Sequence, residues 1–507
     1  MAETEAFAYD RVLYPNYLHP QTHPDRLAAV AKVNGMEPAD VEHCRVLELG
    51  CGTGVGLMSF AFGLPDSEFI GVDLSARQID FGNSVLEEVG ISNLVLRHGD
   101  IMELNRGDLG QFDFVIAHGL YAWTPPAVRD RILWLSRDIL TPQGVAFVSY
   151  NTMPGGRFRQ VVRDLMMFHA RGFEDPNEKV RQSIGIVKFM SESALPDKIH
   201  KKVLEAELEA LLERNVEGVF HDDLAEFFEP VYFRDFVEHA SRHGLQYLDE
   251  AENFKASELS YPNDVLETIE GLAENRIDRE QYLDFLNCRR FRQTLLCHVD
   301  AKLDRDPDAS IINAFRVASH LTPASANPEL VSRSAEKFIG TKSDKIETDH
   351  PLTKAALYHI CSIWPRSAGF AELVAEAKRL LTIASNEFIS SDDDEKILAE
   401  GLLRLFGTGL IHLHLYEPAF SADVSEFPEV SRLARWQAAA GEKLSTLRNE
   451  SIKIDDAIGR ELIKLLDGTR DRERLCSDLG VIAGQRIEPA MLDAKLAELA
   501  KLALFIA

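Results

Sequence analysis

The chain has 507 residues, of which 45% are hydrophobic and 27% are charged, as in an ordinary folded globular protein. Its 81 Asp and Glu residues outnumber its 55 Lys and Arg residues, so the formal net charge is −26. A polyanion of this size repels nucleic-acid phosphates unless its basic residues cluster strongly, and we expect no nucleic-acid partner. An acidic surface would suit a basic protein partner, although it more commonly serves solubility. The length suggests about three domains.

The cysteines and the absence of membrane signals indicate the compartment. The six cysteines are scattered, without a Cys-x-x-Cys pair or a zinc-like spacing. The first residues, Met1-Ala-Glu-Thr-Glu-Ala, lack the basic and apolar regions of a signal peptide. No apolar run approaches the ~20 residues of a membrane helix. We therefore expect a cytoplasmic protein that is not inserted in a membrane.

Residues 45–150 alternate short β-branched runs with amphipathic helical stretches, which is the pattern of a parallel α/β sheet. Helices are expected between the strands, for example over 75–89 and 127–140. Gly144, after Thr141-Pro142, predicts a turn that leads into the fifth strand. The expected strands are 46–49, 69–73, 94–98, 112–117 and 145–150.

Residues 157–300 have mostly helical patterns and contain a second αβ unit. The stretch 233–243 predicts a helix, stopped by Gly244, and 245–248 predicts a short strand. Residues 290–298 suit either a strand or a helix. These pieces could complete the sheet, which would leave 157–230 as a helical insertion.

The C-terminal part divides into a linker and a helical region. Residues 304–350 are rich in Ser, Pro, Asn and Lys and predict the linker. A wing-like hairpin is expected over 402–415, after helices that begin near Thr353, and a similar opening recurs at 455–466. The expected domains are an α/β core at 1–160, a helical region completing the sheet at 161–303, the linker at 304–350, and a winged-helix-like domain at 351–507.

The strongest signal in the chain is Val46-Leu-Glu-Leu-Gly-Cys-Gly-Thr-Gly54. Here a predicted strand leads into glycines that let the backbone turn tightly and approach a ligand, and a helix follows. Dinucleotide-binding folds use a related turn, so the loop alone does not identify the cofactor. We expect Gly50, Cys51 and Gly52 to contact the ligand.

Three acidic residues favour S-adenosyl-L-methionine as this ligand. Glu48 precedes the first glycine, where it could organise the loop or meet the positive end of the cofactor. Asp73 ends the second strand, where a carboxylate can accept both ribose hydroxyls, and Asp100 follows the third, where it can take the adenine amino group. Leu74 and Ile101, next to these acids, complete the expected contacts. Alternatively, the two aspartates only cap the following helices, but three acids at successive strand ends beside a glycine loop favour cofactor binding.

With these residues, the chain resembles the class I S-adenosylmethionine-dependent methyltransferases, and Glu48-Leu-Gly-Cys-Gly-Thr-Gly54 is similar to their first motif. Further segments resemble a narrower bacterial family that carries a methyltransferase regulatory domain, whose best-known members are the rickettsial protein-lysine methyltransferases. These segments are AHGLYAWTP at 117–125, YNTMPGG at 150–156, QTHPDR at 21–26 and FLNCRRFRQT at 285–294.

The resemblance implies an α/β fold with a doubly wound seven-stranded sheet that binds S-adenosylmethionine at Gly50, Gly52, Asp73 and Asp100. It also implies a helical middle region that can serve dimerisation and a winged-helix-like C-terminal domain. The rickettsial enzymes modify lysines of surface proteins.

The acceptor site should be aromatic. Methyl transfer from a sulfonium is an in-line displacement, so the enzyme mainly positions and desolvates a nucleophile. A lysine must first lose its proton, which an apolar pocket promotes by disfavouring the ammonium. The candidate catalytic residues, at the ends of the fourth and fifth strands, are His118, Tyr121, Trp123, Tyr150 and Asn151.

Each of these candidates has a structural alternative. His118 is the best candidate for a proton acceptor or for a contact to the amino-acid end of the cofactor, but it could equally be a hydrogen-bonded structural histidine. Tyr121 and Trp123 could pack in the core of their loop. Tyr150 and Asn151 could simply form the turn that follows them.

The N-terminal segment could fold over the cofactor as a lid and contact it through Tyr14, Gln21 and His23. Farther along the chain, His412 and His414 alternate with apolar residues and are expected to share the solvent face of a strand. Because no Cys or acid lies near them at ligand spacing, we expect no metal there.

The leading hypothesis is a methyltransferase that acts on a protein side chain, with the lysine amine as the preferred acceptor. The large accessory regions suit a macromolecular substrate that is gripped away from the reaction centre. One alternative is N- or O-methylation of a small molecule. Another is a non-catalytic regulatory module that binds the cofactor. The intact cofactor residues disfavour this alternative, because a copy without activity has no reason to keep them. The expected partners are a lysine-bearing protein or a small molecule, with a homodimer through the middle region as an option.

Overall fold

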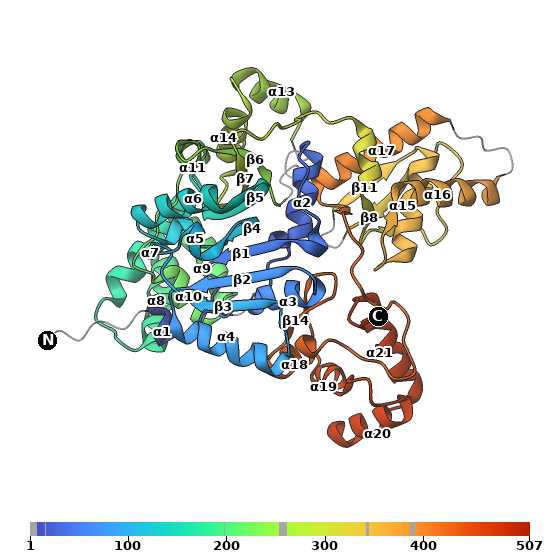
Figure 1. Cartoon of the computed structure of the whole chain (residues 1–507). Helices are drawn as coiled ribbons and strands as arrows, with labels where there is room; N and C mark the ends of the chain where they lie inside the picture. Colours follow the sequence, from blue (N-terminus) through green and yellow to red (C-terminus); the bar gives the residue numbers. More distant parts are fainter. Residues whose placement is uncertain (1–7, 16, 197, 253–260, 341–343, 386–390) are drawn as a thin grey trace.

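A seven-stranded sheet lies at the centre of the N-terminal half of the chain (Figure 1). The computed structural model describes residues 8–15, 17–196, 198–252, 261–340, 344–385 and 391–507. The first five strands in space are parallel, whereas β7 runs antiparallel to β5 and β6. In spatial order the strands are β3 (Leu94–His98), β2 (Glu68–Asp73), β1 (Arg45–Leu49), β4 (Phe112–Ala117), β5 (Leu140–Asn151), β7 (Phe291–His298) and β6 (Leu245–Glu250). This topology confirms the predicted fold class.

Both faces of the sheet are covered by helices, because successive strand residues point to opposite sides. Val46 and Phe114 pack with α2, α3 and α4 in one apolar cluster, whereas Leu47 and Val115 pack with α6 and α11 in another. The helices of this region are α1 (Ala8–Arg11), η1 (Pro20–Thr22), α2 (Pro24–Val33), η2 (Val41–His43), α3 (Val55–Gly63), α4 (Ala76–Val89), α5 (Arg106–Leu109), η3 (Tyr121–Trp123), α6 (Pro126–Ile139) and α11 (Phe233–Arg242).

The turn expected at Gly144 is instead an irregularity inside β5. The strand already begins at Leu140, which pairs with Phe112 of β4, and the next pair in the register is Phe114 with Val145. The ladder therefore accommodates the extra β5 residues as a bulge-like register shift rather than as a separate loop.

A helical insertion follows β5, as expected from the pattern over 157–230. It has an apolar core of its own, to which Val162, Val187, Leu204 and Phe220 contribute. The ambiguous stretch 290–298 forms the strand β7. The helices of the insertion are α7 (Gly156–Ala170), α8 (Pro176–Ser193), α9 (Ile199–Leu212) and α10 (Val216–Asp223), and those between β6 and β7 are α13 (Asn263–Leu272) and α14 (Arg276–Asn287).

The segment predicted as a linker, 304–350, is folded. Phe315, Val317 and Phe338 from this segment are all at most 1% exposed, so apolar anchors spaced among the polar residues tie it down. Its elements are η4 (Ala309–Ala314), β8 (Arg316–Ala318), β9 (Thr322–Pro323), β10 (Glu336–Ile339) and β11 (Lys345–Thr348).

The prediction of a wing-like hairpin over 402–415 is wrong. Leu398, Leu402 and Leu405 have helical spacing and are buried, so this stretch begins as helix α17, which ends at Gly409 in a left-handed conformation. The strand that follows, β13, pairs with β8. The elements of this unit are α15 (Pro351–Ile363), β12 (Ala368–Gly369), α16 (Phe370–Ala384), α17 (Asp392–Thr408) and β13 (His412–His414).

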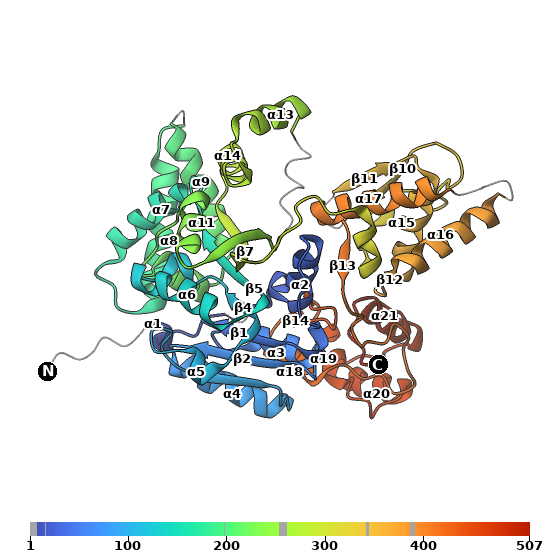
Figure 2. The same ribbon diagram turned by 45° about the horizontal axis from the view of Figure 1, so that its top comes forward.

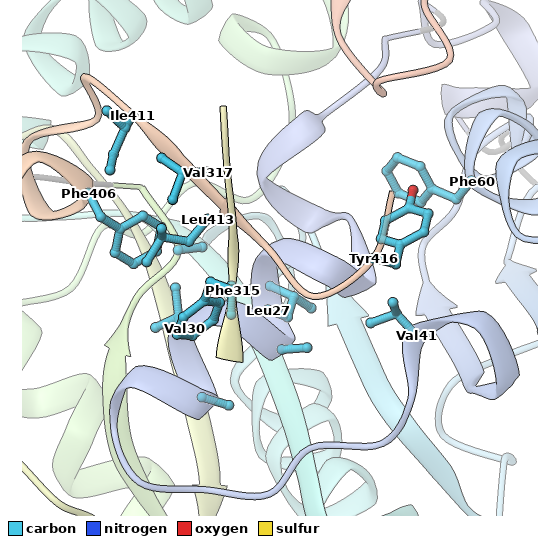
Figure 3. Close-up of a cluster of buried hydrophobic side chains, with 14 of the residues drawn as sticks. Leu27, Val30, Val41, Phe60, Phe315, Val317, Phe406, Ile411, Leu413 and Tyr416 are labelled. Atoms are coloured by element: carbon cyan, nitrogen blue, oxygen red, sulfur yellow. The ribbon is translucent and has the colours of Figure 1, made fainter. Parts of the chain in front are cut away.

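Helix α2 joins this unit to the central sheet. Leu27 and Val30 of α2 lie in the same apolar cluster as Val317 of β8 and Leu413 of β13 (Figure 3). Contacts connect α2 with β13 on one side and with β5 and β6 on the other. The sheet and the unit formed by 309–416 therefore share one continuous core.

His412 and His414 do share one face of β13, opposite the buried Leu413, but that face is not solvent. The ring of His414 lies 2.8 Å from Asp25 of α2 and 2.7 Å from Arg448 of the C-terminal unit. The expectation of a solvent face failed because α2 and the C-terminal unit, both distant in sequence, cover it.

The last unit has a separate core, which includes Ala434, Leu462, Leu475 and Leu496. It gathers next to α3 and α4 (Figure 2), with contacts between α18 and α4. Its elements are α18 (Arg432–Ala440), β14 (Lys443–Ser445), β15 (Ser451–Lys453), α19 (Ala457–Leu465), α20 (Arg472–Ala483) and α21 (Pro489–Lys501). Within the described residues, no helix combines the length and hydrophobicity needed to span a bilayer.

Candidate active site

The glycine loop after β1 forms the floor of the site. Gly52 has φ +56°, and a Cβ built on it would meet no atom within 4 Å, so its backbone faces open space. Gly54 has φ +70°, and its Cβ would lie 2.5 Å from the Leu96 side chain of β3. Gly52 therefore permits a ligand to approach the backbone, whereas Gly54 permits the loop to pack on the sheet.

Asp73 and Asp100 lie at the carboxyl ends of β2 and β3. Gly52 N and Ser75 N donate to the two carboxylate oxygens of Asp73, each at 2.8 Å. Helix α4 is capped by Ser75, whose side chain accepts from Gln78 N, so Asp73 is not the cap of that helix. Asp100 Oδ1 accepts from Met102 N within a turn, at 2.9 Å. Helix capping therefore does not explain these two acids.

A cavity of about 1410 Å³ opens above the loop. The glycine loop and the ends of β1, β2 and β3, which we call the cofactor end, line it with residues that the sequence predicted as cofactor contacts, namely Glu48, Gly50, Cys51, Gly52, Asp73, Leu74, Asp100 and Ile101. His118, Trp123, Asn151 and Phe291 also line the cavity, and the insertion contributes a further wall. The predicted site residues from β1, β2, β3 and β4 thus lie on one surface, as expected at the carboxyl ends of parallel strands.

Glu48 is a buried carboxylate on this surface. Burial, with the charge of Asp73 as the second cause, raises the pKa of Glu48 to about 8. No ion pair involving Glu48 occurs among the described residues. A cationic ligand group beside it would supply the missing positive charge and favour the carboxylate form.

Asn151, at the end of β5, lines the cavity and carries a buried hydrogen-bond acceptor that has no partner. Its side chain is 7% exposed, and its Oδ1 atom has no hydrogen-bond partner. A buried polar oxygen normally has a partner, because leaving it unpaired is unfavourable. The Asn151 oxygen is therefore suited to accept a hydrogen bond from a ligand.

His118 stacks on His19 from the N-terminal segment, with ring centroids 3.8 Å apart. Burial, followed by the neighbouring His19, lowers the pKa of His118 well below its usual value, and burial lowers the pKa of His19 to about 4. Both rings are consequently neutral at pH 7. A histidine with so low a pKa is a weak proton acceptor, so the site favours a contact role for His118.

Three sequence families match the chain: a methyltransferase domain over 46–144, a predicted methyltransferase regulatory domain over 215–298, and the C-terminal winged helix domain of PKMT over 426–498. The uncharacterized protein RP789 of Rickettsia prowazekii (strain Madrid E) is 30% identical over 477 residues, which are 92% of this chain and 84% of that protein. The chain belongs to the class I S-adenosylmethionine-dependent methyltransferases with a regulatory domain.

Two further comparisons agree with this membership. The uncharacterized protein RP028 of the same organism is 34% identical over 241 residues, 47% of this chain and 96% of that protein. The structure of PKMT2 from Rickettsia typhi in complex with AdoHcy superposes with a TM-score of 0.86 at 26% identity, covering 97% of this chain and 100% of that one.

Two of the predicted catalytic residues of this methyltransferase, Tyr121 and Tyr150, do not line the cavity. Tyr121 is 3% exposed and its hydroxyl lies 2.7 Å from His239 Nδ1. Tyr150 is fully buried, stacks on Phe236 and lies 3.0 Å from the Thr294 hydroxyl. Both belong to the apolar cluster under α6 and α11, and neither lines the cavity where they were predicted to lie.

Trp123 does line the cavity of the methyltransferase. It packs against Phe228, with ring centroids 4.6 Å apart, and the Arg159 guanidinium lies 5.1 Å from its ring centre. The aromatic lining of the cavity therefore includes Trp123 and Phe291 but neither Tyr121 nor Tyr150.

The N-terminal segment covers the site, but not with all of the expected residues. Tyr14 lines the cavity, together with Tyr17 and His19. Gln21 does not line the cavity, and neither does His23, which is buried and accepts from Asp25 N as the cap of α2. The capping role of His23 explains its place before Pro24 at the first position of the helix.

The sequence did not predict that residues of the helical insertion line the cavity. The lining residues lie in long polar helical stretches, where no local pattern distinguishes a side chain that faces the cavity from one that faces water. The charged lining residues of the insertion are Arg159, Lys179, Glu207, Glu213, Arg214, Asp222 and Glu226.

Proposed function

We propose that this methyltransferase transfers a methyl group from S-adenosylmethionine to the side-chain amine of a lysine in a protein. The observation that carries the proposal is Asn151, whose buried amide oxygen has no partner and which lines the cavity together with the aromatic residues Trp123 and Phe291. An amine donates hydrogen bonds, so this oxygen is the acceptor that would hold and orient it.

The cofactor end of the cavity suits S-adenosylmethionine, which supplies a methyl group on a positively charged sulfur when bound. Gly52 leaves the backbone accessible. The carboxylates of Asp73 and Asp100 are acceptors for the ribose hydroxyls and the adenine amino group. Glu48, with its raised pKa and no cationic partner among the described residues, suits the positive end of the cofactor.

The acceptor end suits a lysine that arrives charged and reacts neutral. Glu213 in the wall of the insertion can attract an ammonium group, whereas Glu207 and Asp222 are already paired with Arg290 at 2.6 Å and with Arg214 at 3.6 Å. Trp123 and Phe291 present apolar surface that favours the amine over the ammonium. Asn151 would then orient the nitrogen lone pair for in-line displacement, and neutral His118 would add a contact without a repelling charge.

The test separates the acceptor classes. The full chain is incubated with S-adenosylmethionine labelled in its methyl group and a cell lysate divided into protein and small-molecule fractions. We expect label in the protein fraction, released as methyllysine after complete hydrolysis. Label confined to small molecules would overturn the lysine proposal in favour of N- or O-methylation of a small molecule. Binding of S-adenosylhomocysteine without any transfer would instead support a non-catalytic module.

A matched variant checks the cofactor assignment. Asp73→Asn keeps the shape of the side chain but removes the carboxylate that would accept the ribose hydroxyls. We expect S-adenosylhomocysteine to bind at least about tenfold more weakly, since hydrogen bonds to charged groups contribute ~1.5–3 kcal/mol. Unchanged binding would contradict the assignment of Asp73.

Assembly and location complete the proposal. The insertion exposes Phe168, Phe189 and Ile199 by 68%, 59% and 82%, and these side chains are the apolar surface through which a homodimer of the middle region would form. Analytical ultracentrifugation of the full chain tests this, and a strictly monomeric chain contradicts it.

A cytoplasmic location agrees with six cysteines that are all free, and fractionation of cells tests it.

A further inference from the structure

Helices α6 and α11 pack on the same face of the sheet, the one with Leu47 and Val115, and bring two histidines to one carboxylate (Figures 1 and 2). His239 Nε2 lies 3.2 Å from Asp130 Oδ1, and His243 Nε2 lies 2.9 Å from the same oxygen. The two histidines are four residues apart, which places them on one side of a helix. The three ligand atoms all lie within 4.8 Å of one another.

We propose that Asp130, His239 and His243 form a binding site for Zn²⁺. Two imidazole nitrogens and one carboxylate oxygen are a donor set that zinc takes readily, with water in the fourth position. The side chains are 61%, 19% and 14% exposed in that order, so an ion can enter from solvent while the histidines are held by packing. Nothing in the proposed transfer reaction uses these residues, and the site lies outside the cavity.

The surroundings orient the ligands. His239 Nδ1 lies 2.7 Å from the Tyr121 hydroxyl, and such a partner on the second ring nitrogen fixes the orientation of a metal-binding histidine. His243 is the C-terminal cap residue of α11, where the helix dipole favours positive charge. Arg242 is a nearby cation that opposes the site, and its guanidinium pairs with Glu238 at 3.1 Å.

A second histidine cluster in the described part of the chain is less suited to a cation. His320, His412 and Glu450 also bring three ligand atoms within 4.8 Å. However, His412 faces the guanidinium groups of Arg26 and Arg448, which lower its pKa after the effects of burial and of the two neighbouring histidines. A metal ion there would meet the same repulsion, so this cluster serves as the internal comparison.

The experiment measures Zn²⁺ binding to the full chain after removal of bound metal with a chelator. Zn²⁺ is titrated in competition with a chromophoric indicator, and Co²⁺ is titrated in parallel because its visible spectrum reports coordination number. We expect one equivalent of Zn²⁺ per chain at this site and a low-coordinate Co²⁺ spectrum. Tyr121→Phe should weaken Zn²⁺ binding about tenfold, because it removes the partner that orients His239.

Three variants locate the site. His243→Gln and Asp130→Asn should each weaken Zn²⁺ binding at least tenfold, and Asp130→Asn retains an oxygen that can accept from both histidines, so it protects the test against misfolding. The double variant His320→Gln/His412→Gln should bind like the original chain. The proposal is overturned if the original chain shows no saturable binding, if Asp130→Asn and His243→Gln bind as it does, or if only the double variant loses the ion. Since the readout is metal binding, its result is independent of whether lysine is the methyl acceptor.

Discussion

Glu48 links ionisation to cofactor binding at the scale of a single residue. Its carboxyl lies at the end of β1, where burial raises its pKa to about 8. At neutral pH much of this group is therefore protonated in the protein without cofactor. A cation that binds beside it must draw the group into its charged form, which releases a proton and makes binding depend on pH.

We expect the affinity for S-adenosylmethionine to rise between pH 6 and 8, by up to about tenfold per pH unit, because Glu48 loses its proton over this range. Glu48→Gln should bind more weakly at pH 8 and lose most of this dependence. Isothermal titration of both proteins at several pH values checks the prediction, and the shared ligand cancels the titration of the cofactor itself. An equal pH dependence in both proteins would contradict it.

The same group affects the stability of the fold. Since its pKa is raised on folding, the folded state holds a proton that the unfolded state has already lost between about pH 4.5 and 8. The contribution of Glu48 to the free energy of unfolding therefore falls as pH rises through this window. Glu48→Gln should be more stable than the original chain at pH 8 and nearly equal to it at pH 4.5, as measured by denaturant unfolding at both pH values.

Asn151 gives a prediction about the chemical step. Asn151→Ala removes the oxygen proposed to hold the acceptor amine, so turnover with a protein substrate should fall by roughly 2- to 10-fold, corresponding to ~0.5–1.5 kcal/mol for one hydrogen bond between neutral groups. Binding of S-adenosylhomocysteine should change little, since Asn151 is not at the cofactor end. A variant that loses cofactor affinity and turnover in equal measure would place Asn151 in cofactor binding instead.

At the scale of elements, the loop between β1 and α3 contains two glycines with different roles: Gly52 leaves room for a ligand, and Gly54 lets the loop pack on the sheet. Gly52→Ala places a methyl group in the open space of the cavity and should weaken S-adenosylhomocysteine binding strongly, with a stability loss limited to about 1–2 kcal/mol of backbone strain. Gly54→Ala drives its Cβ into Leu96 and should add about 1–3 kcal/mol of overpacking to similar strain. Thermal unfolding and binding titrations of the two variants check this ordering, and the reverse ordering would contradict the assignment.

Elements with local signals were predictable, and those fixed by distant neighbours were not. The strands β1 to β4, the glycine loop and the acids at the strand ends follow from patterns of a few residues. The direction of Tyr150 depends on Phe236, more than eighty positions away in the chain, and so no local pattern reveals it. The polar composition of 304–350 hid Phe315 and Phe338, which are buried and help to fold that segment onto the core.

At the scale of the whole molecule, a chain of contacts connects the last unit to the segment over the active site. Arg448, between β14 and β15, lies 2.7 Å from His414 Nε2, and His414 Nδ1 lies 2.8 Å from Asp25 of α2. The residues just before α2, including His19, line the cavity. The position of the last unit can thus influence how the N-terminal segment covers the cofactor.

Replacing Arg448 should therefore loosen the N-terminal segment. Arg448→Met removes a side chain that is 2% exposed together with its contacts to His414 and to Pro365 O. We expect faster hydrogen exchange in residues 17–30 and a several-fold weaker affinity for S-adenosylhomocysteine. Arg472→Met is the matched control, because Arg472 pairs with Asp493 within the last unit. Equal exchange in the two variants would contradict the connection.

The continuous core around α2 has a consequence for how this protein can be divided and recombined. A chain cut near residue 303 would uncover the apolar side of α2 that packs on β8 and β13, and we expect it to aggregate, since large exposed apolar patches promote association. The unit from 426 onward has its own core, and it touches the rest through Leu433 and Trp436 of α18 and through polar and aromatic side chains elsewhere. We expect that this unit can be exchanged between relatives as a separate module, whereas the sheet and residues 309–416 must be kept together because they share one core.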